Sequence, residues 1–325
     1  MYPQHFKLKD SEFFITNFGE YYFPNKSLRK NLEEIIIFSE DSKKHNIPNG
    51  SVFVYKKSSD YNPRILKTDV GCGITAYLME SLDFDENNRR KTFEEILKVV
   101  TEVNMHIGQG NHFLDFTTTH PSLRTKNEET MFVFLHSDFN NEKYLPVSFE
   151  EAKDLESRAK ERRIEFLERL SSRLGLHGEF YNDWTHNSIN IEDNHIIYRK
   201  GAINLKESNG IGLLALNPVE GLYLYVAEYE DFYNSMQHGV GKKPKTTNQI
   251  AKYDSVFQMY SYGIARGFSP KDLTEMQKET IRSKYKNIDD FIDNFGFEQK
   301  QIGYCVPYFV VKTKGYATKK PFNLL

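Results

Sequence analysis

Hydrophobic residues recur at helical spacing in two stretches of the chain. Phe93, Ile96, Leu97, Val100 and Val103 share one face of a helix that we expect over about 87–104. A second apolar stripe predicts a long helix over about 148–175, and it consists of Ala152, Leu155, Ala159, Ile164, Leu167, Leu170 and Leu174. Ser148 and Glu151 form a capping-box pattern at its start. Charged residues of both signs crowd its other faces, which is typical of a solvated helix.

Shorter apolar runs without helical spacing predict strands. They cover 51–55, 74–79 and 131–135, and His136 follows the last of them directly. Several similar runs, broken by glycines, lie between 194 and 228, and a final strand is expected over 305–312. We expect two more helices over 253–266 and 271–284. Because strands and helices mix without regular alternation, we predict an α+β fold.

Composition and charge narrow the class of protein. The 325 residues are 39% hydrophobic, which is enough for a sizeable core and excludes general disorder. Lys and Arg number 43 against 45 for Asp and Glu, so the net charge is 43 − 45 = −2 and any nucleic-acid site must be local. No repeat or Pro/Gly/Ser-rich linker divides the chain, so we expect one domain over 1–325, with the long helix as an excursion.

Cysteine usage and hydropathy predict a cytoplasmic protein. The two cysteines, Cys72 and Cys305, cannot form a disulfide framework, which favours a reducing compartment. No uncharged run approaches the roughly 18 residues that a membrane span needs. The first ten residues lack the apolar core of a signal peptide. No membrane partner is therefore expected, and the sequence does not determine an oligomeric state.

Asp69 and Cys72 lie in the segment Thr-Asp-Val-Gly-Cys-Gly at 68–73. Its two glycines allow a tight turn that can bring a carboxylate and a thiol to one point. A thiolate can bridge two divalent metal ions, and metal binding ionises the thiol. The alternative is a buried structural cysteine in a turn beside an aspartate cap.

Three histidines extend this set of candidate ligands. His112 follows a Gly-rich segment, His136 ends a predicted strand, and His186 lies in the polar segment 183–188. Each alone is more often a hydrogen-bonded structural histidine. Together with Asp69 and Cys72 they form a mixed N, O and S set, which suits Mn²⁺, Zn²⁺ or Fe²⁺ better than Mg²⁺ or Ca²⁺. Their spacing matches no zinc-finger pattern, so such a site would be assembled from distant segments.

His238 differs from the other histidines because glycines flank it and lysines follow it. Gly239 and Gly241 give the backbone freedom, and Lys242, Lys243 and Lys245 form a basic cluster. An imidazole in this setting can attack a phosphorus atom while the lysines offset phosphate charge. The alternative is a solvated basic loop. Lys252, Lys312, Lys314, Lys319 and Lys320 add local basic character.

Six short motifs occur in the order found in the RtcB family of RNA ligases, which the chain resembles over about 50–315. They are D-x-G-C-G at 69–73, G-x-G-N-H-F at 108–113, His-Ser at 136–137, His-Asn at 186–187, R-K-G-A at 199–202, and H-G-x-G with a following basic residue at 238–242. The resemblance implies a single RtcB-like catalytic domain. It also implies a GTP- and Mn²⁺-dependent ligase that joins RNA ends carrying a 3′-phosphate or 2′,3′-cyclic phosphate to 5′-hydroxyl ends, in RNA repair or tRNA splicing.

The resemblance also implies a role for each residue. Asp69, Cys72 and His112 would hold one Mn²⁺ ion. Cys72, His136 and His186 would hold a second. His238 would attack the α-phosphate of GTP, release pyrophosphate and carry a covalent guanylate that then passes to the RNA 3′-phosphate. The residues expected around the nucleotide are Asn111, Asp115, Asn187, Gly239, Gly241 and Lys312.

Departures from the family pattern keep two other functions open. Val219 and Leu224 stand where the pattern has serine-type hydroxyls near the nucleotide, and Lys242 stands where it has arginine. Asp115 replaces a glutamate, and the Gly/Arg-rich run expected after His136 is absent. One alternative is a metal-dependent phosphoesterase that processes RNA ends without joining them. A non-catalytic RNA-end binder is the other, and it would have no use for the retained nucleophile and ligands.

Overall fold

The structure of the protein is a computed structural model. It describes residues 4–7, 14–15, 21–22, 28, 30–44, 47–83, 85–103, 107, 112–118, 130–138, 144–227, 231–243, 260–262, 265–289 and 300–313. The helices in these ranges are α2 (Pro63–Leu66), α3 (Glu86–Glu102), α4 (Phe149–Leu174) and α5 (Glu275–Arg282), and 3₁₀ turns lie at Lys67–Asp69, Asp231–Asn234 and Pro270–Asp272. Strands dominate the rest, so the prediction of an α+β fold is confirmed.

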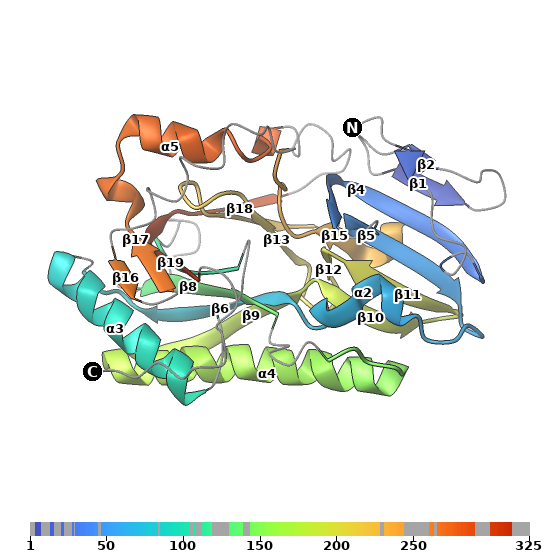
Figure 1. The fold of residues 1–325 in the computed structure, drawn as a ribbon, viewed down its shortest axis with the longest axis horizontal. Helices are drawn as coiled ribbons and strands as arrows, with labels where there is room; N and C mark the ends of the chain where they lie inside the picture. The colour runs from blue at the N-terminus through green and yellow to red at the C-terminus, as the bar shows by residue number, and fades with distance from the viewer. Residues whose placement is uncertain are drawn as a thin grey trace.

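The strands form two large antiparallel sheets and several smaller ones (Figure 1). In the described part of the chain the largest sheet has the order β16 (Tyr260–Tyr262), β17 (Ala265–Phe268), β19 (Pro307–Thr313), β7 (Phe113–Thr117), β8 (Thr130–Ser137), β6 (Gly73–Glu80) and β9 (Gly178–Thr185). The second has the order β1 (Gln4–Lys7), β4 (Leu32–Lys44), β5 (Ile47–Lys56), β11 (His195–Lys200) and β10 (Asn187–Glu192). The small sheets contain β13 (Ile211–Ala215), β14 (Leu222–Val226) and β18 (Lys300–Cys305), the pair β12 (Ala202–Asn204) and β15 (Ser235–Gln237), and the pair β2 (Phe14–Ile15) and β3 (Tyr21–Tyr22).

Both faces of the larger sheet are buried, and the residues of β8 show how. Met131, Val133 and Leu135 pack with the apolar residues of α3 and α4 on one face. Phe132 and Phe134 pack on the other face, against the core that the sheet of β13, β14 and β18 completes. Successive side chains of a strand point to opposite faces, so an almost continuous apolar run is what a strand buried on both sides requires.

Helix α4 runs beneath both large sheets (Figure 1). It begins where the Ser148 side chain accepts a hydrogen bond from the backbone N–H of Glu151, as predicted, and it ends at Gly175, which has the left-handed conformation. The Glu151 carboxylate accepts from Val147 and not from Ser148, so only half of the capping box forms. The predicted helix over 87–104 is confirmed as α3, capped by Asp85.

The predicted strands over 51–55, 74–79 and 131–135 are confirmed within β5, β6 and β8, and the runs between 194 and 228 form β11 to β14. The single-domain prediction stays a prediction. None of the helices in the described ranges is both long enough and apolar enough to cross a membrane.

Three predictions near the C-terminal end need correction. The helix expected over 253–266 is wrong for its last part, because Tyr260–Tyr262 and Ala265–Phe268 are paired antiparallel strands of the larger sheet, while 253–259 and 263–264 lie outside the described residues. The helix expected over 271–284 is shorter. It begins only after Thr274, which forms a capping box with Gln277.

The strand expected over 305–312 is in fact two strands. β18 ends at Cys305 and pairs with β14, whereas β19 begins at Pro307 and pairs with β7. The chain therefore changes sheets at Val306. Proline has no backbone N–H to donate to a ladder, so it is placed at the first residue of the new strand.

Candidate metal centre

The four candidate ligands Cys72, His112, His136 and His186 come together because their strands are neighbours. Gly73 of β6 pairs with Ser137 of β8 on one side and with Thr185 of β9 on the other. Cys72, His136 and His186 each lie one residue from these partners, so all three are at the same end of the sheet and on the same face. His112 comes directly before Phe113, which pairs with His136.

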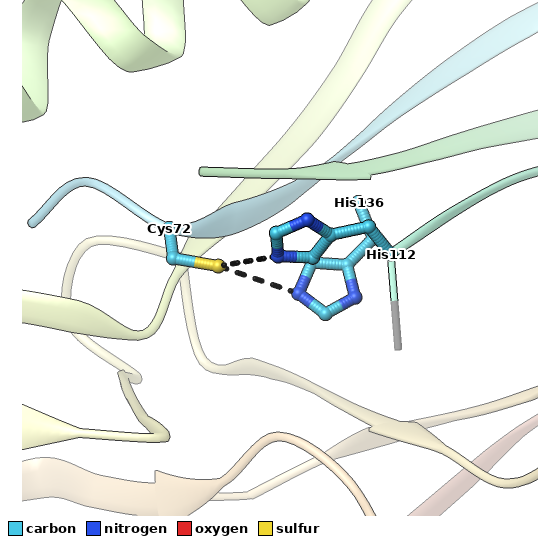
Figure 2. A group of neighbouring side chains, drawn as sticks. All are labelled: Cys72, His112 and His136. Carbon is cyan, nitrogen blue, oxygen red and sulfur yellow. Dashed lines mark hydrogen bonds between the residues drawn. The ribbon is translucent and has the colours of Figure 1, made fainter. Parts of the chain in front are cut away.

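Cys72 is the centre of the first group (Figure 2). Its Sγ lies 3.4 Å from Nε2 of His112 and 3.5 Å from Nε2 of His136. One metal ion bound to a thiolate and an imidazole at tetrahedral angles separates S from N by about 3.6 Å. All three side chains are buried. The donor set and its spacing therefore fit a metal ion, and this group can hold one.

A second group consists of His136, His186 and His238, whose candidate ligand atoms all lie within 4.8 Å of one another. Nδ1 of His186 lies 3.3 Å from the carbonyl oxygen of Trp184, and Nδ1 of His238 lies 2.9 Å from that of Gly201. A carbonyl oxygen only accepts, so both Nδ1 atoms carry the proton and both Nε2 atoms keep a lone pair.

His186 and His238 cannot both bind the same ion in this arrangement. Their rings are stacked, with centroids 3.8 Å apart and planes inclined by 17°. A metal ion lies close to the plane of the imidazole that binds it, and two separated, nearly parallel planes do not meet at such a point. At most one of these two histidines therefore binds an ion together with His136, and the other is available for a different role.

Burial keeps the imidazoles of His136 and His186 neutral and the Cys72 thiol protonated when no metal is bound. Burial and then the neighbouring His112 hold the pKa of His136 well below its usual range, and burial and then His238 do the same to the pKa of His186. Burial, and then Asp138 and Asp69, raise the pKa of the Cys72 thiol. Neutral imidazoles bind metals directly, whereas the thiol must first release its proton.

Asp69 lies outside both groups of candidate ligands. Its carboxylate Oδ2 accepts a hydrogen bond from Nζ of the buried Lys200 at 2.7 Å. Its assignment as a metal ligand stays a prediction.

Asn187 links backbone segments of the site. Its amide donates to the carbonyl oxygen of Asp69 at 3.1 Å, and its Oδ1 accepts from the N–H of Gly201 at 2.8 Å. Gly201 in turn holds Nδ1 of His238. Asn187 therefore connects the turn before Cys72 to the residue that orients His238, and its predicted contact with a nucleotide stays a prediction.

Asp115 and Lys312 lie beside the metal ligands on the same face of the sheet. Val310 pairs with Asp115, and Lys312 Nζ lies 5.9 Å from the Phe113 ring centroid. Burial raises the pKa of Asp115 despite the opposing charge of Lys312, and burial and then Lys242 lower the pKa of Lys312. Asp115 Oδ1 is buried with no hydrogen-bond partner among the described residues, so this carboxyl can accept a ligand donor.

The loop after His238 packs close to the core. Gly239 bridges to Ala215, whose carbonyl oxygen lies 3.2 Å from where a Cβ on Gly239 would be. Gly241 has φ +79°, which favours glycine. Asn111, also predicted to contact the nucleotide, lies outside the described residues.

Val219 and Leu224 are both part of the hydrophobic core. Leu224 is fully buried between Leu213 and Gly303, so its side chain completes the packing of its sheet.

The sequence argument overlooked Arg163, a fully buried arginine of α4. It lies four residues from both Ala159 and Leu167, in the middle of the apolar stripe. An arginine at such a position must have buried partners. The four-residue spacing of Arg163 from Ala159 and Leu167 was therefore the sequence signal that it is buried.

No family model matches the chain, and no curated protein matches it.

Proposed function

We propose that the protein is a metal-dependent nucleotidyl-transfer enzyme, and specifically an RNA ligase of the RtcB type. It would join RNA 3′-phosphate or 2′,3′-cyclic phosphate ends to 5′-hydroxyl ends through a covalent histidine–GMP intermediate. One observation carries the proposal: a buried Cys/His group lies beside a fourth histidine, His238, that is oriented by a backbone carbonyl and cannot share an ion with His186, on which it stacks.

His238 has the features of a nucleophile toward phosphorus. Its Nδ1 donates to Gly201, so Nε2 carries the reactive lone pair, and stacking on His186 restricts the ring to one orientation. Attack by Nε2 on the α-phosphorus of GTP forms an N–P bond and breaks the bond to pyrophosphate. A 2′,3′-cyclic end must first be opened by water to a 3′-phosphate. An oxygen of the 3′-phosphate then attacks the guanylate phosphorus, and the N–P bond to His238 breaks. The 5′-hydroxyl oxygen attacks the phosphorus of the RNA 3′-phosphate, and GMP leaves.

Cationic side chains near His238 support a phosphate-bearing substrate. Lys242 is close enough to Lys312 to lower its pKa. Residues 241–243 lie against 284–286, where Lys243 N–H donates to Lys284 and Lys286 N–H donates to Gly241. Four lysines thus line adjacent backbone segments next to the nucleophile, and lysines are common ligands of RNA phosphates.

Cys72, His112, His136 and His186 would hold the metal, which we propose to be Mn²⁺ in two sites, with Asp69 as an additional ligand at the first. When bound, the metal would supply Lewis-acid stabilisation of charge on the phosphate oxygens. Asp115 and Lys312 would contact the nucleotide, because the buried Asp115 carboxyl and the half-buried lysine lie beside the imidazoles on one face.

A metal-dependent RNA-end phosphoesterase is the second candidate. It is favoured by the burial of Val219 and Leu224 in the hydrophobic core, where the RtcB pattern has hydroxyls near the nucleotide. Such an enzyme would use the same metal ligands to open cyclic phosphate ends, with water attacking the phosphorus and one P–O ester bond breaking, and it would form no covalent guanylate.

The test that separates the two is incubation of the protein with α-labelled GTP and Mn²⁺, followed by denaturing electrophoresis. We expect label on the protein that is lost in acid and kept in alkali, as a histidine phosphoramidate requires, and joining of a 2′,3′-cyclic-phosphate RNA to a 5′-hydroxyl RNA. Hydrolysis of the RNA end with no labelled protein would support the phosphoesterase. If the protein shows neither guanylation nor hydrolysis of the RNA end, both candidates are overturned.

A further inference from the structure

We propose that Arg163 is a positioning residue for the metal centre, acting through the backbone from the opposite face of the sheet. The inference rests on the proposed metal centre and adds a residue outside its ligands. Arg163 belongs to the long helix α4, and its side chain has no exposed surface.

The ligands and Arg163 lie on opposite faces of the same three strand ends. Cys72, His136 and His186 point to the face of the core that contains Phe134 and Trp184. Their neighbours in the chain point the other way, toward α4, as the alternation of a strand requires. Arg163 therefore lies directly behind the ligands without touching a metal or substrate.

The guanidinium contacts a residue next to each of three ligands. Its Nη1 donates to the carbonyl oxygen of Gly71, before Cys72, at 2.6 Å, and to that of Ser137, after His136, at 3.2 Å. Its Nη2 donates to Oγ1 of Thr185, before His186, at 3.0 Å. One rigid planar group thus fixes the relative positions of three chain segments, which a lysine with a single nitrogen cannot do.

The charge of Arg163 is balanced within the same network. Its Nη2 lies 2.9 Å from Oδ2 of the buried Asp183, and its Nε donates to Oγ1 of Thr75 at 2.9 Å. Thr75 and Thr185 both donate to the Asp183 carboxylate. A fully paired network of this kind restricts its members to one geometry.

Gly73 provides independent support for the role of Arg163. A Cβ at this position would lie 2.6 Å from Nη2 of Arg163 and 2.9 Å from Cα of Thr185. The glycine after Cys72 therefore leaves room for the guanidinium, and the segment that carries the cysteine is shaped around Arg163.

Arg163→Lys tests the proposal, because it keeps a positive charge opposite Asp183 but removes the fork that joins Gly71, Ser137 and Thr185. Co²⁺ alone is the probe, since its thiolate charge-transfer and d–d absorption bands report the geometry of the ligands. We expect Co²⁺ to bind the variant 10- to 100-fold more weakly, with a changed d–d spectrum, as is typical when an outer partner of metal ligands is lost. Arg169→Lys is the matched control, because Arg169 lies exposed on the same helix and pairs with Glu165.

Thr75→Val is a second variant that keeps the volume of the side chain and removes only one hydroxyl partner of Arg163. Thr75→Val tests the role of Arg163 if Arg163→Lys does not fold. We expect it to bind Co²⁺ more weakly than the wild type, by a smaller factor than Arg163→Lys, and to show the same change in the d–d spectrum. Wild-type affinity and spectrum in the folded variants would overturn the role of Arg163 while leaving the metal centre intact. Absence of a thiolate band in the wild-type protein would overturn the metal centre, and the proposal with it.

Discussion

The imidazole rings of His186 and His238 stack with their centroids 3.8 Å apart and their planes inclined by 17°. Both rings donate from Nδ1 to backbone carbonyl oxygens, of Trp184 and Gly201, so Nε2 of each neutral ring is unprotonated. Because the nearly parallel planes exclude a shared ion, the stack places a candidate metal ligand against a candidate nucleophile. The two histidines should therefore have separable roles.

Replacing each histidine tests this separation. His238→Ala should bind Mn²⁺ as the wild type does but take up no label from α-labelled GTP, because the attacking nitrogen is gone. His186→Ala should lose bound metal as well as label. Metal content by elemental analysis and label on the denatured protein give the two readouts, and His177→Ala, at an exposed position, is the control. Labelled guanylate on His238→Ala would show that another residue is the nucleophile.

Cys72→Ala should abolish the tight metal site and the activity while the fold is kept, because the buried sulfur of Cys72 lies within 3.5 Å of Nε2 of both His112 and His136. Burial raises the pKa of this thiol, so metal binding must displace a proton. Affinity for the metal in the wild type should then rise with pH by about tenfold per unit around neutrality. Calorimetric titration at several pH values measures both effects. Unchanged metal stoichiometry in Cys72→Ala would contradict the dinuclear site.

Much of this site was predictable from sequence because its ligands lie in short local patterns. Cys72 lies between two glycines, and His136 ends an apolar strand. The structure places these two residues together with His112 and His186, as predicted. Sheet registers bring the four together, and registers depend on long-range pairing that local sequence does not encode.

The parts that were missed depend on tertiary contacts. Arg163 was not singled out, yet helical spacing places it in the buried stripe, where Asp183 and four backbone or hydroxyl partners compensate its burial. Tyr260–Tyr262 joins a sheet although its surroundings favour a helix, because pairing with β17 and then β19 overrides local propensity. The burial of Arg163 and the strand conformation of Tyr260–Tyr262 both depend on which strands are neighbours in the sheet.

Gly71, which precedes Cys72, is required by backbone conformation and by packing against α4, and the sequence alone did not show the packing. Gly71 has φ +79°, and a Cβ there would lie 2.7 Å from Cβ of Ala159 in α4. Gly71→Ala should therefore combine about 1–2 kcal/mol of backbone strain with about 1–3 kcal/mol of overpacking. Gly175→Ala is the matched control, because Gly175 has φ +70° and no atom within 4 Å of the added Cβ. Urea unfolding of both variants measures the difference, and equal losses would show that α4 does not press on the turn.

Glu156 of α4 gives a prediction for the pH dependence of stability. Its Oε1 accepts from the N–H of Ile189 at 2.6 Å, and its Oε2 accepts from Lys153 at 2.7 Å. Burial outweighs these partners and raises the pKa of this carboxyl from 4.5 to about 7. Between these values the folded protein retains a proton that the unfolded chain has lost. The free energy of unfolding should therefore fall as pH rises through this range and level off above it.

Glu156→Gln isolates this contribution, because glutamine keeps an oxygen for the Ile189 N–H and has no proton to lose. The stability of the variant relative to the wild type should increase between pH 5 and pH 8, by about 3 kcal/mol at most. Urea unfolding at both pH values provides the measurement, and Glu150→Gln, in the exposed first turn of the same helix, should show no such increase. If the difference between Glu156→Gln and the wild type stayed constant over this range, the buried carboxyl would already be ionised at pH 5. Its two hydrogen bonds, and not its burial, would then determine its protonation.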